Sequence, residues 1–231
     1  MFPLNFRKTF ACARSLTLAL AAAAALVAGC ADSNGESRDA NQAEQAFLAA
    51  MAPHHELATA MAAVAAERAR HPELEDLARA IRTSQEAEIR QIARIHRRLT
   101  GETLRPNVDA HAQLGLTAEE AGMMHDGRDA VAELKRAKPF DRAFIDAMVP
   151  HHQGAIRMAR AVLAVGEDRE LRQLAERIVA DQTREIAQMN RWRAAWYGED
   201  SPSGGVPKSG SGGAEPMDGA EREPGGGHER H

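Results

Sequence analysis

Two stretches of the sequence share one unusual pattern: FLAAMAPHHELATAM at residues 47–61 and FIDAMVPHHQGAIRM at residues 144–158. Each contains Met-x-Pro-His-His, and a second Met follows six residues after the last His. A shift of 97 residues aligns 47–99 with 144–196 without a gap and gives 19 identities in 53 positions. A match of this length indicates an internal duplication in which each copy is one supersecondary unit.

Each copy has the periodicity of two helices. Steps of four and three residues keep one stripe on one face of a helix. In the first helix of each copy this stripe consists of Phe47, Met51, His54, Ala58, Met61 and Ala65, and of Phe144, Met148, His151, Ala155, Met158 and Val162. A second periodic segment follows, with Pro72 or Asp168 at its start and Gly101 or Gly198 after its end, as is typical of helix termini. Two helical hairpins predict an all-α four-helix bundle over residues 41–197.

The connection between the copies, residues 100–143, is too long for a bare loop. Thr117 and Glu120 resemble a capping box, and residues 129–137 are good helix formers. We expect two short helices here that cross the end of the bundle.

The two ends of the chain have compositions of their own. Residues 1–29 combine a basic start with an apolar run that is too short to span a membrane, and they predict a signal peptide. The run ends in Val-Ala-Gly-Cys, which resembles a lipobox and predicts lipid on Cys30; a plain secretory signal is the alternative. Residues 30–40 then form a polar tether, and residues 198–231, rich in Gly, Ser and Pro, form a disordered tail. We therefore expect an exported lipoprotein, in the periplasm or at the cell surface.

Composition excludes several classes. The formal net charge is −4, and nothing suggests a nucleic-acid partner. The chain has two cysteines, and cleavage before Cys30 removes the other, so the mature protein has no internal disulfide and no multi-thiolate metal site.

Polar residues interrupt the apolar stripes at equivalent places. His54 and His151 occupy stripe positions, and His55 and His152 come one step around the helix. A hairpin that turns near residue 71 places His54 opposite Glu88, and a turn near 168 places His151 opposite Glu185. Pro53 and Pro150 either bend these helices or start new ones.

Two interpretations of this pattern stay open. A buried His–Glu layer can fix the register of a bundle. Alternatively, the histidines bind a metal together with soft thioether ligands, and the duplication of the pair favours this second interpretation. The candidate metal-binding residues are His54, His55, His151, His152, Met51, Met61, Met148, Met158, Met189, Glu88 and Glu185.

The residues FIDAMVPHHQGAIRMA resemble the signature of the bacterial family called domain of unknown function 305, approximately F-x-x-x-M-x-x-H-H-x-x-A-x-x-M-A. A downstream Q-x-x-E-I-x-x-M-x-x-W pattern is similar at residues 182–192. The first copy departs from it, with Ile92 in place of Met189 and Ile95 in place of Trp192. The resemblance implies a ferritin-like fold, an exported or membrane-attached protein and, for some members, copper binding linked to copper resistance.

The leading hypothesis is a lipid-anchored copper-binding protein, not an enzyme, that sequesters the metal or hands it to an envelope partner. A ferritin-like di-iron or di-manganese oxidase and an interaction module without metal are the alternatives. Because thioether prefers Cu(I), we expect the second copy, which has Met189, to contribute more to Cu(I) affinity than the first.

Overall fold

The structure is a computed structural model that describes residues 33–123 and 127–208. These residues contain no strand. Their helices are α1 (Ser33–Arg68), α2 (Pro72–Thr100), the 3₁₀ helix η1 (Val108–Leu114), α3 (Gly127–Arg136), α4 (Phe140–Val165) and α5 (Arg169–Tyr197). The all-α prediction is confirmed. No helix in the described part of the chain is long and apolar enough to cross a membrane.

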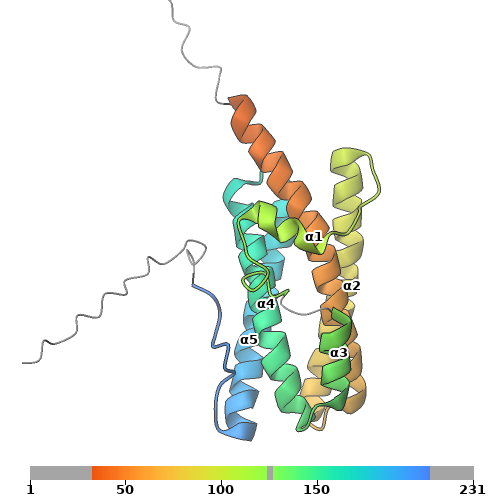
Figure 1. The fold of residues 1–231 in the computed structure, drawn as a ribbon, viewed down its shortest axis with the longest axis vertical. Coiled ribbons are helices and arrows are strands. Elements are labelled where there is room, and N and C mark those ends of the chain that lie inside the picture. Colours follow the sequence, from red (N-terminus) through yellow and green to blue (C-terminus); the bar gives the residue numbers. More distant parts are fainter. Residues whose placement is uncertain (1–32, 124–126, 209–231) are drawn as a thin grey trace, which may run out of the picture.

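The four long helices pack as two antiparallel pairs (Figure 1). Helix α1 packs on α2, α4 packs on α5, and α1 and α4 join the pairs. The helix ends that these residues predicted are present. Helix α2 begins at Pro72, and at the start of α5 the Asp168 side chain accepts a hydrogen bond from the Leu171 N–H at 2.9 Å. Gly101 and Gly198 follow the ends of α2 and α5 in the left-handed conformation. Each copy of the duplication is therefore one helical hairpin.

Helices α1 and α4 both continue through their internal prolines. Because Pro53 has no N–H, the carbonyl of Ala49 loses its helical partner. The backbone N–H of Asn107, just before η1, donates to that carbonyl at 2.9 Å. The carbonyl that Pro53 leaves without a helical partner therefore accepts a hydrogen bond that holds the connection against α1.

The connection lies along the side of the molecule rather than across its end. Helices η1 and α3 pack mainly against α1 and also contact α4 (Figure 1). The capping box between Thr117 and Glu120 forms, but it closes a turn and starts no helix. Gly154 of α4 lies directly under this turn, where an added Cβ would come within 2.2 Å of the Ala121 carbonyl oxygen. The backbone can approach α4 this closely only because residue 154 is glycine.

The buried apolar residues form two clusters, and each cluster combines both copies of the duplication. The Met51 cluster includes Phe47, Met51, Ile92, Met158 and Ile178. The Met189 cluster includes Met61, Ile81, Phe144, Met148 and Met189. Each cluster contains residues of both copies because α1 packs antiparallel on α4, so the start of one helix lies beside the end of the other.

Two equivalent carboxylates fasten the hairpins to each other. Asp141, at the start of α4, accepts hydrogen bonds from the backbone N–H groups of Arg70 and His71 in the α1–α2 turn, at 2.9 and 3.0 Å. Glu44, which is 97 residues earlier, accepts from the N–H groups of Glu167 and Asp168 in the α4–α5 turn, at 2.6 and 2.7 Å. Each hairpin therefore caps the turn of the other.

Both ends of the helical body differ from the sequence expectation. Helix α1 begins at Ser33, so most of the expected tether is helical. Residues 199–208, expected within a disordered tail, lie on α4 and α5, where the Gln153 amide donates to the carbonyls of Ser203 and Gly205 at 2.8 and 2.6 Å. The Gln153 side chain thus donates to backbone carbonyls that composition alone predicts to be solvated. The expected signal peptide and Cys30 lie outside the described residues, as do residues 209–231.

Candidate metal centre

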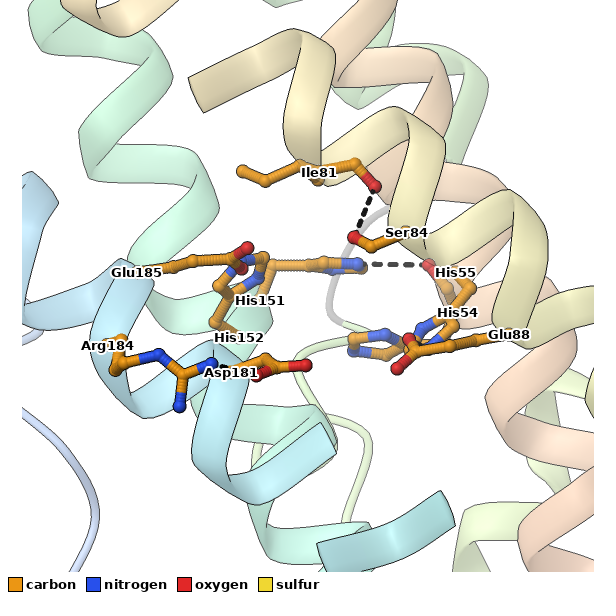
Figure 2. A network of polar contacts seen from close by, with 10 residues as sticks. All are labelled: His54, His55, Ile81, Ser84, Glu88, His151, His152, Asp181, Arg184 and Glu185. Atoms are coloured by element: carbon orange, nitrogen blue, oxygen red, sulfur yellow. Dashed lines mark hydrogen bonds and ion pairs between the residues drawn. The ribbon is translucent and has the colours of Figure 1, made fainter. Parts of the chain in front are cut away.

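The four duplicated histidines form one layer between the Met51 and Met189 clusters, and we call it the histidine layer (Figure 2). The rings of His54 and His151 stack where α1 meets α4, with their centroids 3.7 Å apart and their planes 15° apart. The Nε2–H of His151 donates to the backbone carbonyl of His54 at 3.0 Å. Both copies thus contribute to a single central site.

The other two histidines each contact a glutamate of their own hairpin. His55 Nε2 lies 2.8 Å from Glu88 Oε2, and His152 Nε2 lies 2.7 Å from Glu185 Oε2 (Figure 2). The predicted pairs, His54 with Glu88 and His151 with Glu185, were wrong by one residue. Turn-centred spacing gives the height of a residue along the hairpin, whereas the rotation about the helix axis decides which of two adjacent histidines faces the partner helix.

Several buried polar atoms of the layer have no hydrogen-bond partner among the described residues. They are both ring nitrogens of His54 and the Nδ1 atoms of His55 and His152. The Oε1 atom of Gln85 on α2 and both amide atoms of Gln182 on α5 are buried without such a partner as well. Buried polar groups without partners are rare in folded proteins, and each one calls for an explanation such as a bound ion. Imidazole nitrogens with free lone pairs are metal donors.

Burial keeps the stacked histidines neutral. Burial lowers the pKa of the His54 imidazole well below its ordinary value, and His151 and its other histidine neighbours lower it further. Burial likewise lowers the pKa of His151 to about 3, with a further contribution from His152. A neutral imidazole binds a metal ion without first releasing a proton, so the His54 ring is prepared for metal at neutral pH. The His151 ring already contacts the backbone of His54 and of Gly122.

The methionines predicted as ligands are all buried, on both sides of the histidine layer. Met51 and Met158 belong to one apolar cluster, and Met61, Met148 and Met189 belong to the other. Within residues 33–123 and 127–208, no group of three or more His, Cys, Asp or Glu side chains is arranged to hold a metal ion. The donors that the layer offers are therefore imidazole nitrogens with thioethers nearby, a set that suits a soft ion such as Cu(I).

A cavity of about 310 Å³ connects this region with the covering segments. Its lining includes His151, Met61, Gly122 of the connection and Ser203 of the C-terminal segment. The connection was expected across the end of the bundle and residues 199–208 in a disordered tail. Their contacts with α4 depend on Gly154 and Gln153, where the first copy has Leu57 and Glu56.

A family model, that of domain of unknown function 305, matches residues 44–221. The chain belongs to this family. The match includes both His-His motifs, and the resemblance noted in the sequence is confirmed. Among curated proteins, no sequence match is found.

Several solved structures are similar to the chain. The Cu(I)-bound form of the protein CopM is 33% identical, with a TM-score of 0.57, and the alignment covers 67% of this chain and 97% of CopM. CopM is also known in apo, Cu(II)-bound and silver-bound forms. A fragment from Deinococcus radiodurans is 29% identical, with a TM-score of 0.56 and coverage of 66% and 96%. A family protein from Streptomyces coelicolor, described as secreted, is 22% identical, with a TM-score of 0.61 and coverage of 70% and 98%, and this likeness concerns the fold alone.

Proposed function

We propose that this protein binds copper in the histidine layer and sequesters it or hands it to another protein. One observation carries the proposal: the layer contains imidazole nitrogens that are buried, neutral or unpartnered, and flanked by buried methionines. The similarity to CopM, which binds Cu(I), Cu(II) and silver, supports the same metal class.

The residues have unequal roles in this proposal. His54, His55 and His152 offer ring nitrogens that have no hydrogen-bond partner within residues 33–123 and 127–208. His151 has one nitrogen engaged with the His54 carbonyl, and it holds the stack while lining the cavity. The methionines of both clusters supply thioethers that favour Cu(I) over harder ions.

The buried methionines of the two clusters differ at one pair of equivalent positions. Met189 and Ile92 are both fully buried and occupy the same place in the two copies, but they lie in different clusters. Among the buried methionines, the additional thioether therefore lies at one end of the layer, where Met189 lies with Met61 and Met148, while the partly buried Met123 packs against the Met51 cluster.

An anaerobic Cu(I) titration against a chromophoric chelator tests the proposal. We expect His55→Ala and His152→Ala to weaken Cu(I) binding by at least the roughly 10–100-fold that loss of an outer-shell partner typically costs. His96→Ala, a half-exposed histidine of α2 outside the layer, is the control. Wild-type stoichiometry and affinity in both layer variants would refute the proposal.

A reciprocal exchange tests the thioether contribution. Met189→Ile should lower Cu(I) affinity and leave Cu(II) affinity nearly unchanged, because only the soft ion prefers sulfur. Ile92→Met should have the opposite effect on Cu(I). Equal effects on both oxidation states would exclude Met189 as a source of selectivity.

A purely structural layer is the second candidate, and the His55–Glu88 and His152–Glu185 hydrogen bonds favour it. It leaves the unpartnered nitrogens of His54 unexplained. The two candidates differ in one measurable property: a structural layer gives the same thermal midpoint with and without Cu(I), whereas a binding site raises the midpoint as ligand concentration rises.

We further propose an exported lipoprotein whose four long helices form a ferritin-like bundle with no catalytic activity. The apolar N-terminal run and the residues before Cys30 support export and lipidation. Mass spectrometry of the membrane fraction tests this step, since Cys30→Ser should abolish the lipid mass and release the protein. The oxidase alternative normally requires several inward carboxylates, and in the layer Glu88 and Glu185 already accept hydrogen bonds from histidine.

A further inference from the structure

Two glutamates contact the histidine layer in the same way, although sequence analysis places them among the metal ligands. Glu88 Oε2 lies 2.8 Å from His55 Nε2, and Glu185 Oε2 lies 2.7 Å from His152 Nε2. Both rings are fully buried, while the two carboxylates keep side-chain exposures of 14% and 17%. The arrangement occurs once in each hairpin, so the duplication has kept it as a unit.

The hydrogen bond decides which ring nitrogen carries the proton. An ionised carboxylate only accepts hydrogen bonds, so the nitrogen that faces it at this distance must be the N–H. In a neutral imidazole the other nitrogen then has the lone pair. That other nitrogen is Nδ1 of His55 and of His152, and each is buried without a partner in the part of the chain that the structure describes.

We propose that Glu88 and Glu185 are positioning residues that hold His55 and His152 in the Nε2–H tautomer and so present Nδ1 to the metal ion. This inference rests on the proposed copper function and assigns the donor atom within it. The carboxylates bind no metal themselves. They orient the rings and make Nδ1 more basic, as carboxylates do for metal-bound histidines in general.

Nitrogen-15 NMR of the histidine-labelled protein tests the tautomer before any metal is added. Long-range ¹H–¹⁵N correlations distinguish a protonated Nε2 from a protonated Nδ1. We expect Nε2–H for His55 and His152 in the metal-free protein, and loss of this preference in Glu88→Ala and Glu185→Ala respectively. Nδ1–H in the parent protein, or an unchanged tautomer in both variants, would overturn the inference.

Silver(I) and Cu(I) titrations then test the donor atom. Both ions are diamagnetic, and binding should shift the Nδ1 resonances while the Nε2 protons remain. Cu(I) affinity should fall by about 10–100-fold in Glu185→Ala, which is typical for loss of an outer-shell carboxylate. Glu185→Gln, whose amide oxygen can still accept from Nε2–H, should retain part of this affinity and guards against a variant that fails to fold. Glu86→Ala, an exposed glutamate of α2 paired with Arg82, is the matched control.

The outcomes separate the two proposals. A parent protein that binds neither ion would refute the copper function, whatever its tautomers. A parent that binds through Nε2, or whose affinity is the same in Glu88→Ala and Glu185→Ala as in the control, would refute the positioning role alone.

Discussion

The stacked pair His54 and His151 should make the metal-free protein sensitive to acid. Burial lowers the pKa of His151 to about 3 in the folded state, whereas an unfolded histidine titrates near about 6.5. Between these values the unfolded chain binds a proton that the native chain does not. Stability is therefore complete above the unfolded pKa and falls as pH decreases toward the folded pKa.

The expected magnitude follows from the width of that window. Each pH unit below about 6.5 costs about 1.4 kcal/mol for one such group, so His151 alone removes about 2 kcal/mol between pH 8 and pH 5. His54 is shifted in the same direction and adds to the loss. This is a large part of the stability of an ordinary domain.

Urea unfolding, followed by the fluorescence of Trp192 and Trp196 with a chelator present, measures this loss as a function of pH. His151→Gln keeps a side-chain N–H for the His54 carbonyl but does not titrate, and it should flatten the acid limb by at least the contribution of His151. His54 also contributes to the smaller loss of stability in this variant, because His151 helps to lower the pKa of His54 in the parent protein. His96→Gln is the control and should follow the parent curve. Parallel curves for parent and His151→Gln would refute the assignment of the acid sensitivity to the stacked pair.

Three further changes have effects of predictable direction. Gly154→Ala should lower the free energy of unfolding by about 1–3 kcal/mol or more, because the added methyl group meets backbone atoms. Gly35→Ala, where nothing lies within 4 Å of the added methyl group, should be neutral or stabilising because alanine has the higher helix propensity. The midpoints of urea unfolding compare the two variants. Asp141→Ala should cost about 1–3 kcal/mol by leaving turn N–H groups without their acceptor, while exposed Glu176→Ala should change the midpoint little. Gln153→Ala should release the segment 199–208, and limited proteolysis should then cleave there faster than in the parent; equal rates would show that other contacts hold it.

Local signals in the sequence were sufficient for the four long helices and for the ends of α2 and α5, but not for the start of α1. Helix caps and stripes depend on residues within one or two turns, so Pro72, Asp168 and the closing glycines could be placed without a structure. The histidine layer was also predictable, since duplicated polar residues on apolar stripes must lie at equivalent heights. The rotation of each helix about its axis was not predictable, and for this reason the partner of Glu88 is His55 rather than the expected His54.

Contacts between the hairpins could not be predicted in the same way. Glu44 and Asp141 are equivalent under the shift of 97 residues, but they precede the aligned segments, and nothing in either copy indicates that each carboxylate caps the turn of the other hairpin. The ordered residues 199–208 were missed for a related reason. Their composition describes the segment itself, whereas the Gln153 amide that holds it lies on α4.

The turn caps, the histidine stack and the methionine clusters each combine residues from both copies of the duplication. A single hairpin has one carboxylate without a turn to cap, one histidine without its stacking partner and only some of the methionines of each cluster. The histidine layer therefore forms only when two hairpins combine, and a difference between the copies becomes a difference between the two ends of this layer. Ile92 and Met189 illustrate this, because each lies with methionines of both copies rather than beside the histidines of its own copy alone. Under the proposed copper function, we expect the buried thioether of Met189 to raise the preference for a soft ion at its end of the layer, where the cavity reaches Met61 and His151.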